Sequence, residues 1–311
     1  MAGSPARPES VPSVVAIFGP TASGKTAVAE AVAGRLGGEV VSADSMQAYR
    51  GLRILTAQPT RPTRLVAIWP LAHEGSVAEY AQLAHAEIDD LLAAGRTPVV
   101  AGGTGLYLRA ALAELRLPPA PSSSLRARWE RLYDRLGADR AYAVLSERDP
   151  DAAARVHAND RRRVVRALEL TDLGSSLRPA EDRLWTEETR HPTVIFGLEV
   201  SRDALGKRIE RRARAMFEAG VVGEVRAALA GPISTTAVHA LGLREIAESS
   251  PNRALEVLIL RTRRYAAYQR KWMRRIPGLV SVNGDRAADE IADDIVEMAG
   301  AWQRLSAGRA G

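Results

Sequence analysis

The chain has 311 residues, a net charge of +6 and 46% hydrophobic residues, which is enough apolar material for one large domain or two modest ones. It has no cysteine, which excludes disulfides and thiolate metal sites, and its five histidines are scattered without metal-ligand spacing. No apolar run approaches the length of a membrane span, and the first thirteen residues lack the apolar segment of a signal peptide. We therefore expect a cytoplasmic protein with no membrane partner and a flexible tail over residues 1–13.

The first part of the chain alternates between strand-like and helix-like patterns. The apolar run VVAIF (14–18) leads through a glycine-rich loop into the helical pattern KTAVAEAVAGRLG (25–37). A strand-like run at 38–45, an amphipathic helix at 76–96 and a strand-like run at 97–105 follow. This order predicts a parallel sheet flanked by helices.

The pattern changes in the middle of the chain. Residues 118–190 contain no strand-like run and are helical, charged and rich in arginine, which predicts a helical insertion. A strand-like run returns at 193–202, and a last short strand is expected at 279–283. The predicted core therefore comprises residues 14–117 and 191–300, with a second flexible tail at 301–311.

The loop GPTASGKT, residues 19–26, matches the pattern G-x-x-x-x-G-K-[ST] between a strand and a helix. Glycines allow backbone N–H groups to point at phosphate oxygens, and the following helix presents its positive end to the same anion. Lys25 adds a full charge, although only three of the 43 basic residues are lysines, and Thr26 offers a hydroxyl to Mg²⁺. The fold-class prediction is an α/β protein with a P-loop NTPase-like parallel sheet flanked by helices and a helical insertion subdomain.

Two polar residues end neighbouring strands of the predicted sheet. Asp44 follows the second strand and Thr104 follows the third, so both are expected at the sheet edge that carries the loop. Asp44 could accept a proton, but an aspartate after a strand is equally typical of a turn. It could also be a metal ligand of a phosphoryl-transfer enzyme, so the residues alone leave kinase chemistry open.

Taken together, GPTASGKT, SADSMQAYRGL, TAQPT, AGGTGLYLRA and NDRRRVVRALEL resemble the bacterial tRNA dimethylallyltransferase family in order and spacing, over roughly residues 14–283. The resemblance implies transfer of a dimethylallyl group from dimethylallyl diphosphate to the N6 amine of adenosine 37, in the anticodon loop of tRNA. It also implies that the loop holds the diphosphate leaving group, with Mg²⁺ as the cofactor.

The resemblance assigns roles to individual residues. The catalytic residues that it implies are Asp44 and Thr104. The diphosphate-binding residues are Gly19, Pro20, Thr21, Ala22, Ser23, Gly24, Lys25, Thr26 and Arg212, and Thr26 is also the metal ligand. The tRNA-binding residues are Asp44, Ser45, Met46, Gln47, Thr104, Arg126, Arg162, Arg163, Val164, Val165 and Arg166.

The chain departs from the family pattern at several positions, and its segment from Thr60 to Val77 is shorter than usual. The family has glycine, lysine and tyrosine where this chain has Leu55, Gln58 and Leu243, and lysine and arginine where it has Ala267 and Tyr268. These departures concern tRNA binding and loop closure rather than the diphosphate site.

Alternative interpretations remain open from the residues. A basic stripe such as that of Arg162 and Arg166 is by itself typical of a solvated helix face, and the aromatic residues of the segment 265–272 are typical of a core face. The rival functions are isopentenyl transfer to free adenine nucleotides, small-molecule phosphoryl transfer, and RNA binding without catalysis. The arginine-rich insertion favours tRNA, because a mononucleotide needs no such platform. We expect a monomer.

Overall fold

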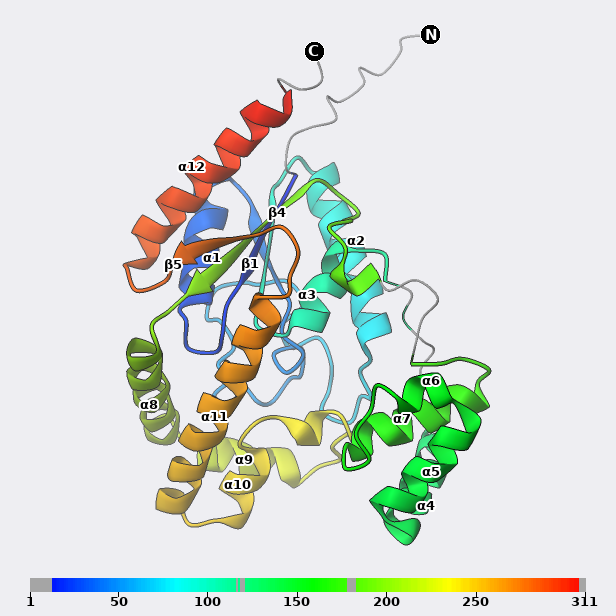
Figure 1. Cartoon of the computed structure of the whole chain (residues 1–311). Coiled ribbons are helices and arrows are strands. Elements are labelled where there is room, and N and C mark those ends of the chain that lie inside the picture. Colours follow the sequence, from blue (N-terminus) through cyan, green and yellow to red (C-terminus); the bar gives the residue numbers. More distant parts are fainter. Residues whose placement is uncertain (1–12, 116, 118–120, 178–182, 308–311) are drawn as a thin grey trace. The chain divides into compact units, whose positions relative to one another are not determined.

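The structure, a computed structural model, describes residues 13–115, 117, 121–177 and 183–307 (Figure 1). It divides into two compact units. Unit 1 comprises Met1–Glu114 and Glu187–Gly311, and unit 2 comprises Leu115–Thr186. Unit 1 holds the sheet, whereas unit 2 is helical.

The sheet of unit 1 has five parallel strands in the order β2-β3-β1-β4-β5. The strands are β1 Val14–Phe18, β2 Glu39–Ser42, β3 Pro98–Gly102, β4 Thr193–Glu199 and β5 Leu279–Asn283. Every residue of β1 and β3 is buried, as expected for parallel strands that are covered on both faces. The predicted parallel sheet flanked by helices is therefore confirmed, and all strands end at one edge.

Alternating side chains of β1 contribute to two separate cores. Val15 and Ile17 face α1 (Lys25–Arg35) and α12 (Ala288–Ala307). Val14, Ala16 and Phe18 face the other side, where α2 (Val77–Ala93) and α3 (Gly105–Leu112) pack. Figure 1 shows these helices on opposite sides of the sheet. The central strand is thereby fixed on both faces, and with it the loop that follows.

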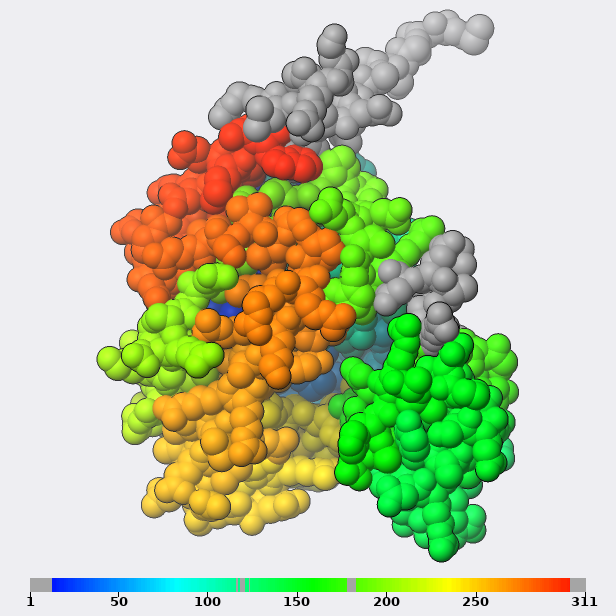
Figure 2. Space-filling model, in the orientation of Figure 1, coloured from blue at the N-terminus to red at the C-terminus, as the bar shows by residue number. Residues whose placement is uncertain are grey.

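A further helical layer of unit 1 surrounds a third core. Its helices are α8 Arg202–Glu218, α9 Val221–Leu229, η2 Ala237–His239, α10 Leu243–Glu248 and α11 Pro251–Met273. Leu52, Leu243 and Leu258 are among the buried residues that join these helices to the segment after β2. In the space-filling view, the orange atoms of α11 lie on the side of the molecule that is turned toward the viewer (Figure 2).

Unit 2 has its own core. Its helices are α4 Ser123–Leu136, α5 Ala138–Arg148, α6 Pro150–Ala153, α7 Arg161–Asp172 and η1 Arg183–Trp185. Trp129, Leu145 and Leu168 are buried together between these helices. The Trp129 indole N–H donates to Asp172 at 2.8 Å, so the polar edge of the largest core side chain is also satisfied.

The structure differs from the prediction at three boundaries, and the first is that unit 2 begins at Leu115 rather than at residue 118. The segment 187–190 belongs to unit 1, because the Arg190 N–H donates to the Leu112 carbonyl at 2.8 Å and its guanidinium pairs with Asp89 at 2.9 Å. Residues 301–307 are not a flexible tail but continue α12, whose buried residues Ile291 and Ile295 pack on the sheet. The predicted tail segments 1–12 and 308–311 lie outside the described residues. Within the described ranges, no helix has the length and apolar character needed to cross a bilayer.

Gly102, the last residue of β3, provides a test of the packing around the sheet. A Cβ at this position would lie 2.1 Å from the Ala43 carbonyl oxygen, which is a backbone atom and cannot rotate away. We expect Gly102→Ala to lower the free energy of unfolding by about 1–3 kcal/mol in urea titrations. In the matched control Gly34→Ala, an exposed position of α1 with nothing within 4 Å of the added Cβ, the free energy of unfolding should rise by about 0.5–1 kcal/mol. Equal effects of the two substitutions would contradict the packing.

Candidate active site

The loop of residues 19–26 joins β1 to α1, and its glycines are required by its geometry. Gly24 has φ 92°, in the left-handed region that favours glycine. A Cβ on Gly19 would lie 2.6 Å from the Ser23 hydroxyl. Ala22 also has a positive φ of 63°, a conformation that costs about 1 kcal/mol for a residue with a Cβ. Strain of this kind is typical of ligand-binding loops whose backbone groups are directed at a ligand.

Ser23 is the buried polar residue of this loop. It is only 2% exposed, and its hydroxyl makes no hydrogen bond with any of the described residues. A buried hydroxyl without a partner costs free energy, so it is a strong indication that a polar ligand binds beside it. A phosphate oxygen would satisfy it, because the loop amides and the N-terminus of α1 favour an anion at the same place.

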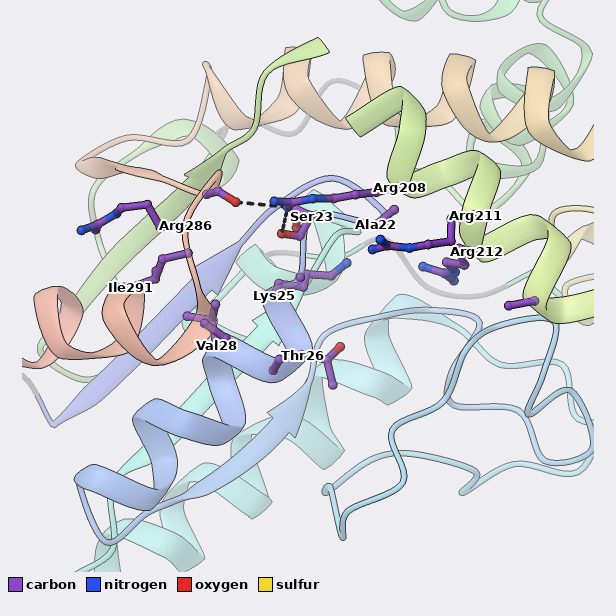
Figure 3. Close-up of a pocket in the computed structure, with 15 residues that line it drawn as sticks. Ala22, Ser23, Lys25, Thr26, Val28, Arg208, Arg211, Arg212, Arg286 and Ile291 are labelled. Carbon is purple, nitrogen blue, oxygen red and sulfur yellow. Dashed lines mark hydrogen bonds between the residues drawn. The ribbon is translucent and has the colours of Figure 1, made fainter. Parts of the chain in front are cut away.

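A pocket of about 700 Å³ lies beside the loop and is lined by cationic side chains (Figure 3). Figure 3 shows Lys25 pointing toward the guanidinium groups of Arg211 and Arg212, which come from α8. Arg286, by contrast, points away from the loop and forms an ion pair with Asp294. The pocket is therefore suited to an anion held between α1 and α8.

Two arginines of α8 also fasten the loop itself. Arg208 donates to the Ser23 carbonyl at 3.0 Å and to the Gly284 carbonyl at 3.1 Å. Arg212 donates to the Thr21 hydroxyl at 3.0 Å. The predicted diphosphate-binding residues of the loop and Arg212 are thus brought together, and Arg208 and Arg211 are additional cations of this site.

The pKa values of two cations at this site are lowered. Part of the Lys25 side chain is accessible from the pocket, but its ammonium is surrounded by protein, and this burial lowers its pKa to about 8. Asp44 opposes the shift and Arg212 adds to it. Burial likewise lowers the pKa of Arg212, again opposed by Asp44. An anion in the pocket would stabilise both charged forms.

The two predicted catalytic residues reach the same sheet edge. Asp44 accepts a hydrogen bond from the Met46 N–H at 3.0 Å, so it has the turn role that is typical of an aspartate after a strand, and its charge also acts on Lys25 and Arg212. Thr104 is the N-cap residue of α3, and its buried hydroxyl makes no hydrogen bond of good geometry with the described residues. Burial raises the pKa of the neighbouring Tyr265 hydroxyl, and Thr104 lies close enough to that hydroxyl to oppose part of this rise.

Two residues of α11 at this edge were missed by the sequence analysis as site residues. Gln269 is 2% exposed, and it contacts Thr21 of the loop 19–26 and Gly103 beside Thr104. The half-buried Tyr265 lies next to Thr104 and Gln269, and burial raises its pKa to about 12. The available signal was a lone amide in the otherwise apolar helical stripe of Ala266 and Met273, at positions three and four residues away.

The predicted tRNA-binding strip after β2 has a structural role as well. The Gln47 amide accepts from the Ser42 hydroxyl at 3.0 Å and donates to the Ala57 carbonyl at 3.1 Å. Ser45 and Met46 are half-buried, and Met46 packs against two of the apolar cores. The side chain of Gln47 therefore holds the segment 56–57 in place, and this role is independent of any contact with RNA.

The departures from the family pattern have structural explanations at three positions. Gln58 donates to the carbonyls of Gln47 and Tyr49, at 3.1 and 2.7 Å, and so fastens the strip after β2. Leu55 and Leu243 are both buried in the same apolar core, so both replacements contribute apolar side chains to that core. Ala267 and Tyr268 are exposed on α11, and nothing in the structure explains their replacement.

The predicted tRNA-binding residues of unit 2 fall into three groups. The side chains of Val164 and Val165 are buried in the core of unit 2, so a contact of these two predicted residues with RNA would have to come from their backbone. Arg126 and Arg166 pair with the buried Glu169, at 3.3 and 3.2 Å. Arg162 and Arg163 are exposed and remain candidates for contact with a polyanion.

The donors at the loop fit Mg²⁺ only in combination with a phosphate ligand. Thr26 lines the pocket and offers one hydroxyl oxygen. The described part of the chain contains no group of three or more histidine, cysteine, aspartate or glutamate residues that could hold a metal ion. Mg²⁺ commonly keeps several waters and binds phosphate oxygens with few protein ligands, so the residues present are compatible with it.

The loop, the cationic pocket and the parallel sheet define a P-loop protein with a site for a phosphate-containing ligand. A family model described as IPP transferase matches residues 47–276, and one described as Isopentenyl transferase matches residues 12–65. The chain belongs to the IPP transferase family, and its predicted P-loop NTPase-like fold is confirmed.

Relatives of known structure or curated name agree with this assignment. The chain is 40% identical over 290 residues to the tRNA dimethylallyltransferase of Streptomyces griseus, covering 89% of this chain and 92% of the relative. It is 42% identical over 294 residues to that of Anaeromyxobacter sp., covering 90% and 97%. The crystal structure of the tRNA isopentenylpyrophosphate transferase from Bacillus halodurans is 32% identical, covers 96% of this chain and 98% of its own, and has a TM-score of 0.70.

The lowered pKa of Lys25 predicts how pyrophosphate binding depends on pH. A bound anion raises the pKa of Lys25 above its unbound value of about 8. Below that pH the ammonium of Lys25 is already charged, so its titration does not change the affinity for pyrophosphate. Above it, binding must take up a proton, and affinity should fall by up to about tenfold per pH unit.

Titration calorimetry of inorganic pyrophosphate across this pH range measures the effect. Because pyrophosphate titrates as well, Lys25→Arg is the control, since its guanidinium stays charged throughout. The wild-type affinity should fall more steeply with pH than that of the variant. Identical slopes would show that Lys25 does not titrate in this range.

Proposed function

We propose that this chain is a tRNA dimethylallyltransferase. It transfers the dimethylallyl group of dimethylallyl diphosphate to the N6 amine of adenosine 37 in tRNA, giving N6-isopentenyladenosine and diphosphate. The observation that carries the proposal is the placement of a phosphate loop and its cations beside Asp44 and Thr104 at one sheet edge. Relatives about 40% identical over most of the chain bear the name of this activity.

In this reaction the loop serves the leaving group. The bond between the allylic carbon and the diphosphate oxygen breaks, and its electron pair leaves on the diphosphate. Lys25 and Arg212 line the pocket beside the loop, where that charge would grow, and preorganised groups of this kind stabilise a transition state most effectively. Thr26 would hold Mg²⁺, which when bound would neutralise part of the charge on the diphosphate.

The acceptor amine needs a proton acceptor and a fixed orientation. The lone pair of the amine nitrogen forms the new bond to the allylic carbon, and the nitrogen then loses a proton. Asp44 is a carboxylate whose charge reaches the cations of the loop, and we assign it as the acceptor of this proton. The buried hydroxyl of Thr104 is assigned to orient the amine.

The helical unit is assigned to tRNA. A base stacked in the anticodon loop must be extruded to reach an enclosed site, which costs a few kcal/mol that contacts to the RNA backbone must offset. The exposed Arg162 and Arg163 are suited to phosphate contacts, whereas Arg126 and Arg166 are also bound to Glu169 inside unit 2. A monomeric state and a cytoplasmic location stay predictions.

One assay separates the proposal from its rivals. Isotopically labelled dimethylallyl diphosphate is incubated with the protein and with either tRNA or AMP, and the label is followed into each acceptor. The proposal predicts label in tRNA. Equal efficiency with AMP would favour an adenine-nucleotide isopentenyltransferase, and transfer of the γ-phosphate of ATP to a small molecule without prenylation would favour a kinase.

The role of Asp44 is tested by Asp44→Asn. The substitution removes the proton acceptor but keeps the side-chain volume, so kcat should fall by about 10²- to 10⁴-fold while the Kd for tRNA stays nearly unchanged. Asp90→Asn, an exposed position of α2, is the matched control and should behave as the wild type. A loss confined to tRNA binding would make Asp44 a recognition residue instead.

The role of unit 2 is tested with the double variant Arg162→Ala/Arg163→Ala. We expect the KM for tRNA to rise and the slope of log affinity against log salt to decrease by about 1 for each phosphate that the variant no longer binds. The affinity for pyrophosphate should not change. The matched control is Arg131→Ala/Arg135→Ala, two exposed arginines of α4. An unchanged salt slope in the first variant would remove these arginines from the RNA interface.

A further inference from the structure

Gln269 is a polar residue on the buried face of α11. It is 2% exposed, and the buried residues on either side of it along this face are Ala266 and Met273. A buried amide costs free energy unless its donor and acceptor are both satisfied, so its hydrogen bonds are the reason that it is tolerated. They go to two different loops of the active site.

Each end of the Gln269 amide has a fixed partner. The side-chain oxygen accepts from the Thr21 N–H at 2.8 Å, in the middle of the diphosphate loop. The side-chain nitrogen donates to the Gly103 carbonyl at 2.8 Å, in the residue directly before Thr104. These two partners fix the orientation of the amide. It joins the diphosphate loop (residues 19–26) to the segment of Gly103 and Thr104, which we call the acceptor loop.

The surroundings are built for this contact. A Cβ on Gly103 would lie 2.3 Å from the Gln269 side-chain nitrogen, so glycine is what allows the approach. Arg212 holds the side chain of Thr21 from the opposite helix, at 3.0 Å, while Gln269 holds its backbone. The Tyr265 hydroxyl lies within reach of both Gln269 and Thr104, which extends the connection toward the acceptor side.

The connection bears on catalysis rather than on binding. The Thr21 N–H is donated to Gln269, so it is not one of the amides available to the diphosphate. The distance between the allylic carbon and the attacking amine, however, depends on the relative position of the two loops. A misplacement of about 1 Å between reacting groups can lower a rate by about 10²-fold.

We propose that Gln269 is a positioning residue that holds the diphosphate loop and the acceptor loop at the spacing required for allyl transfer. It touches neither substrate, and it acts through Thr21 and Gly103. This inference rests on the proposed function, and it adds to that function a residue on a helix far from both loops in sequence.

The first test is Gln269→Met, which keeps the length of the side chain and removes both hydrogen bonds. We expect kcat for tRNA prenylation to fall by about 10²-fold, because the loops lose their common support. The Kd values for inorganic pyrophosphate and for tRNA, measured separately, should change by less than about threefold, since the substitution removes no group that touches a ligand.

A matched control separates positioning from stability. Met273→Ala removes a buried side chain of the same helix face and lowers the melting temperature through the cavity that it leaves. The thioether side chain of Met273 cannot hold the two loops by hydrogen bonds as the Gln269 amide does, so kcat of the variant, measured well below its melting temperature, should stay close to the wild-type value. A loss of kcat in Met273→Ala equal to that in Gln269→Met would overturn the positioning role.

A second variant tests the positioning role through the pH dependence of kcat, which a purely structural role of Gln269 would leave unchanged. Gln269→Glu keeps the shape, and when protonated it can donate to Gly103 while accepting from Thr21, whereas the ionised form repels the Gly103 carbonyl. The ratio of its kcat to that of the wild type should therefore rise as pH falls. A ratio independent of pH would overturn the proposal.

The outcomes also distinguish this inference from the proposed function. A wild-type protein without transfer to tRNA would overturn the proposed function and this inference together. An active wild type with kcat of Gln269→Met within about threefold of its own would overturn the inference alone.

Discussion

The accumulation of positive charge around the loop of residues 19–26 is the constraint on which the rest of the site depends. Lys25 and Arg212 come from helices far apart in the sequence, and each is partly desolvated, which lowers both pKa values. Two buried cations in one pocket are unfavourable by themselves. The arrangement is consistent with a protein that binds a multiply charged anion, and Asp44 moderates the repulsion from the acceptor side of the same edge.

The fold supplies what this charge cluster needs. A parallel sheet brings the ends of β1, β2 and β3 to one edge, so the loop, Asp44 and Thr104 become neighbours although they lie in separate segments. The packed cores on both faces keep β1 rigid. Helices α8 and α11 then close over the edge, one contributing cations and the other the amide of Gln269. The phosphate loop and the segment of Thr104, which the proposed function assigns to the leaving group and the acceptor, are thereby held in one frame.

The local sequence pattern was enough to predict the strands, the phosphate loop and the helical insertion. These features depend on the spacing of hydrophobic residues and glycines within a few neighbouring positions, which can be read from the sequence directly. The sequence was less informative where tertiary packing decides which side chains are buried. Val164 and Val165 stand between arginines of a matching motif, yet their helix turns them into the core of unit 2. Gln269 was missed because its partners Thr21 and Gly103 are remote in sequence, and only the folded chain brings them together.

The central claim is that the loop holds a leaving group and not a phosphoryl group to be transferred. Dimethylallyl diphosphate labelled with ¹⁸O at the oxygen between carbon and phosphorus tests it most directly, with tRNA as acceptor and mass spectrometry of both products. The account predicts that all of the label leaves in diphosphate and that the tRNA gains an isopentenyl group, because the carbon–oxygen bond breaks. Label recovered in dimethylallyl monophosphate with a phosphoryl group on the acceptor, or in dimethylallyl alcohol with a diphosphoryl group on the acceptor, would contradict it.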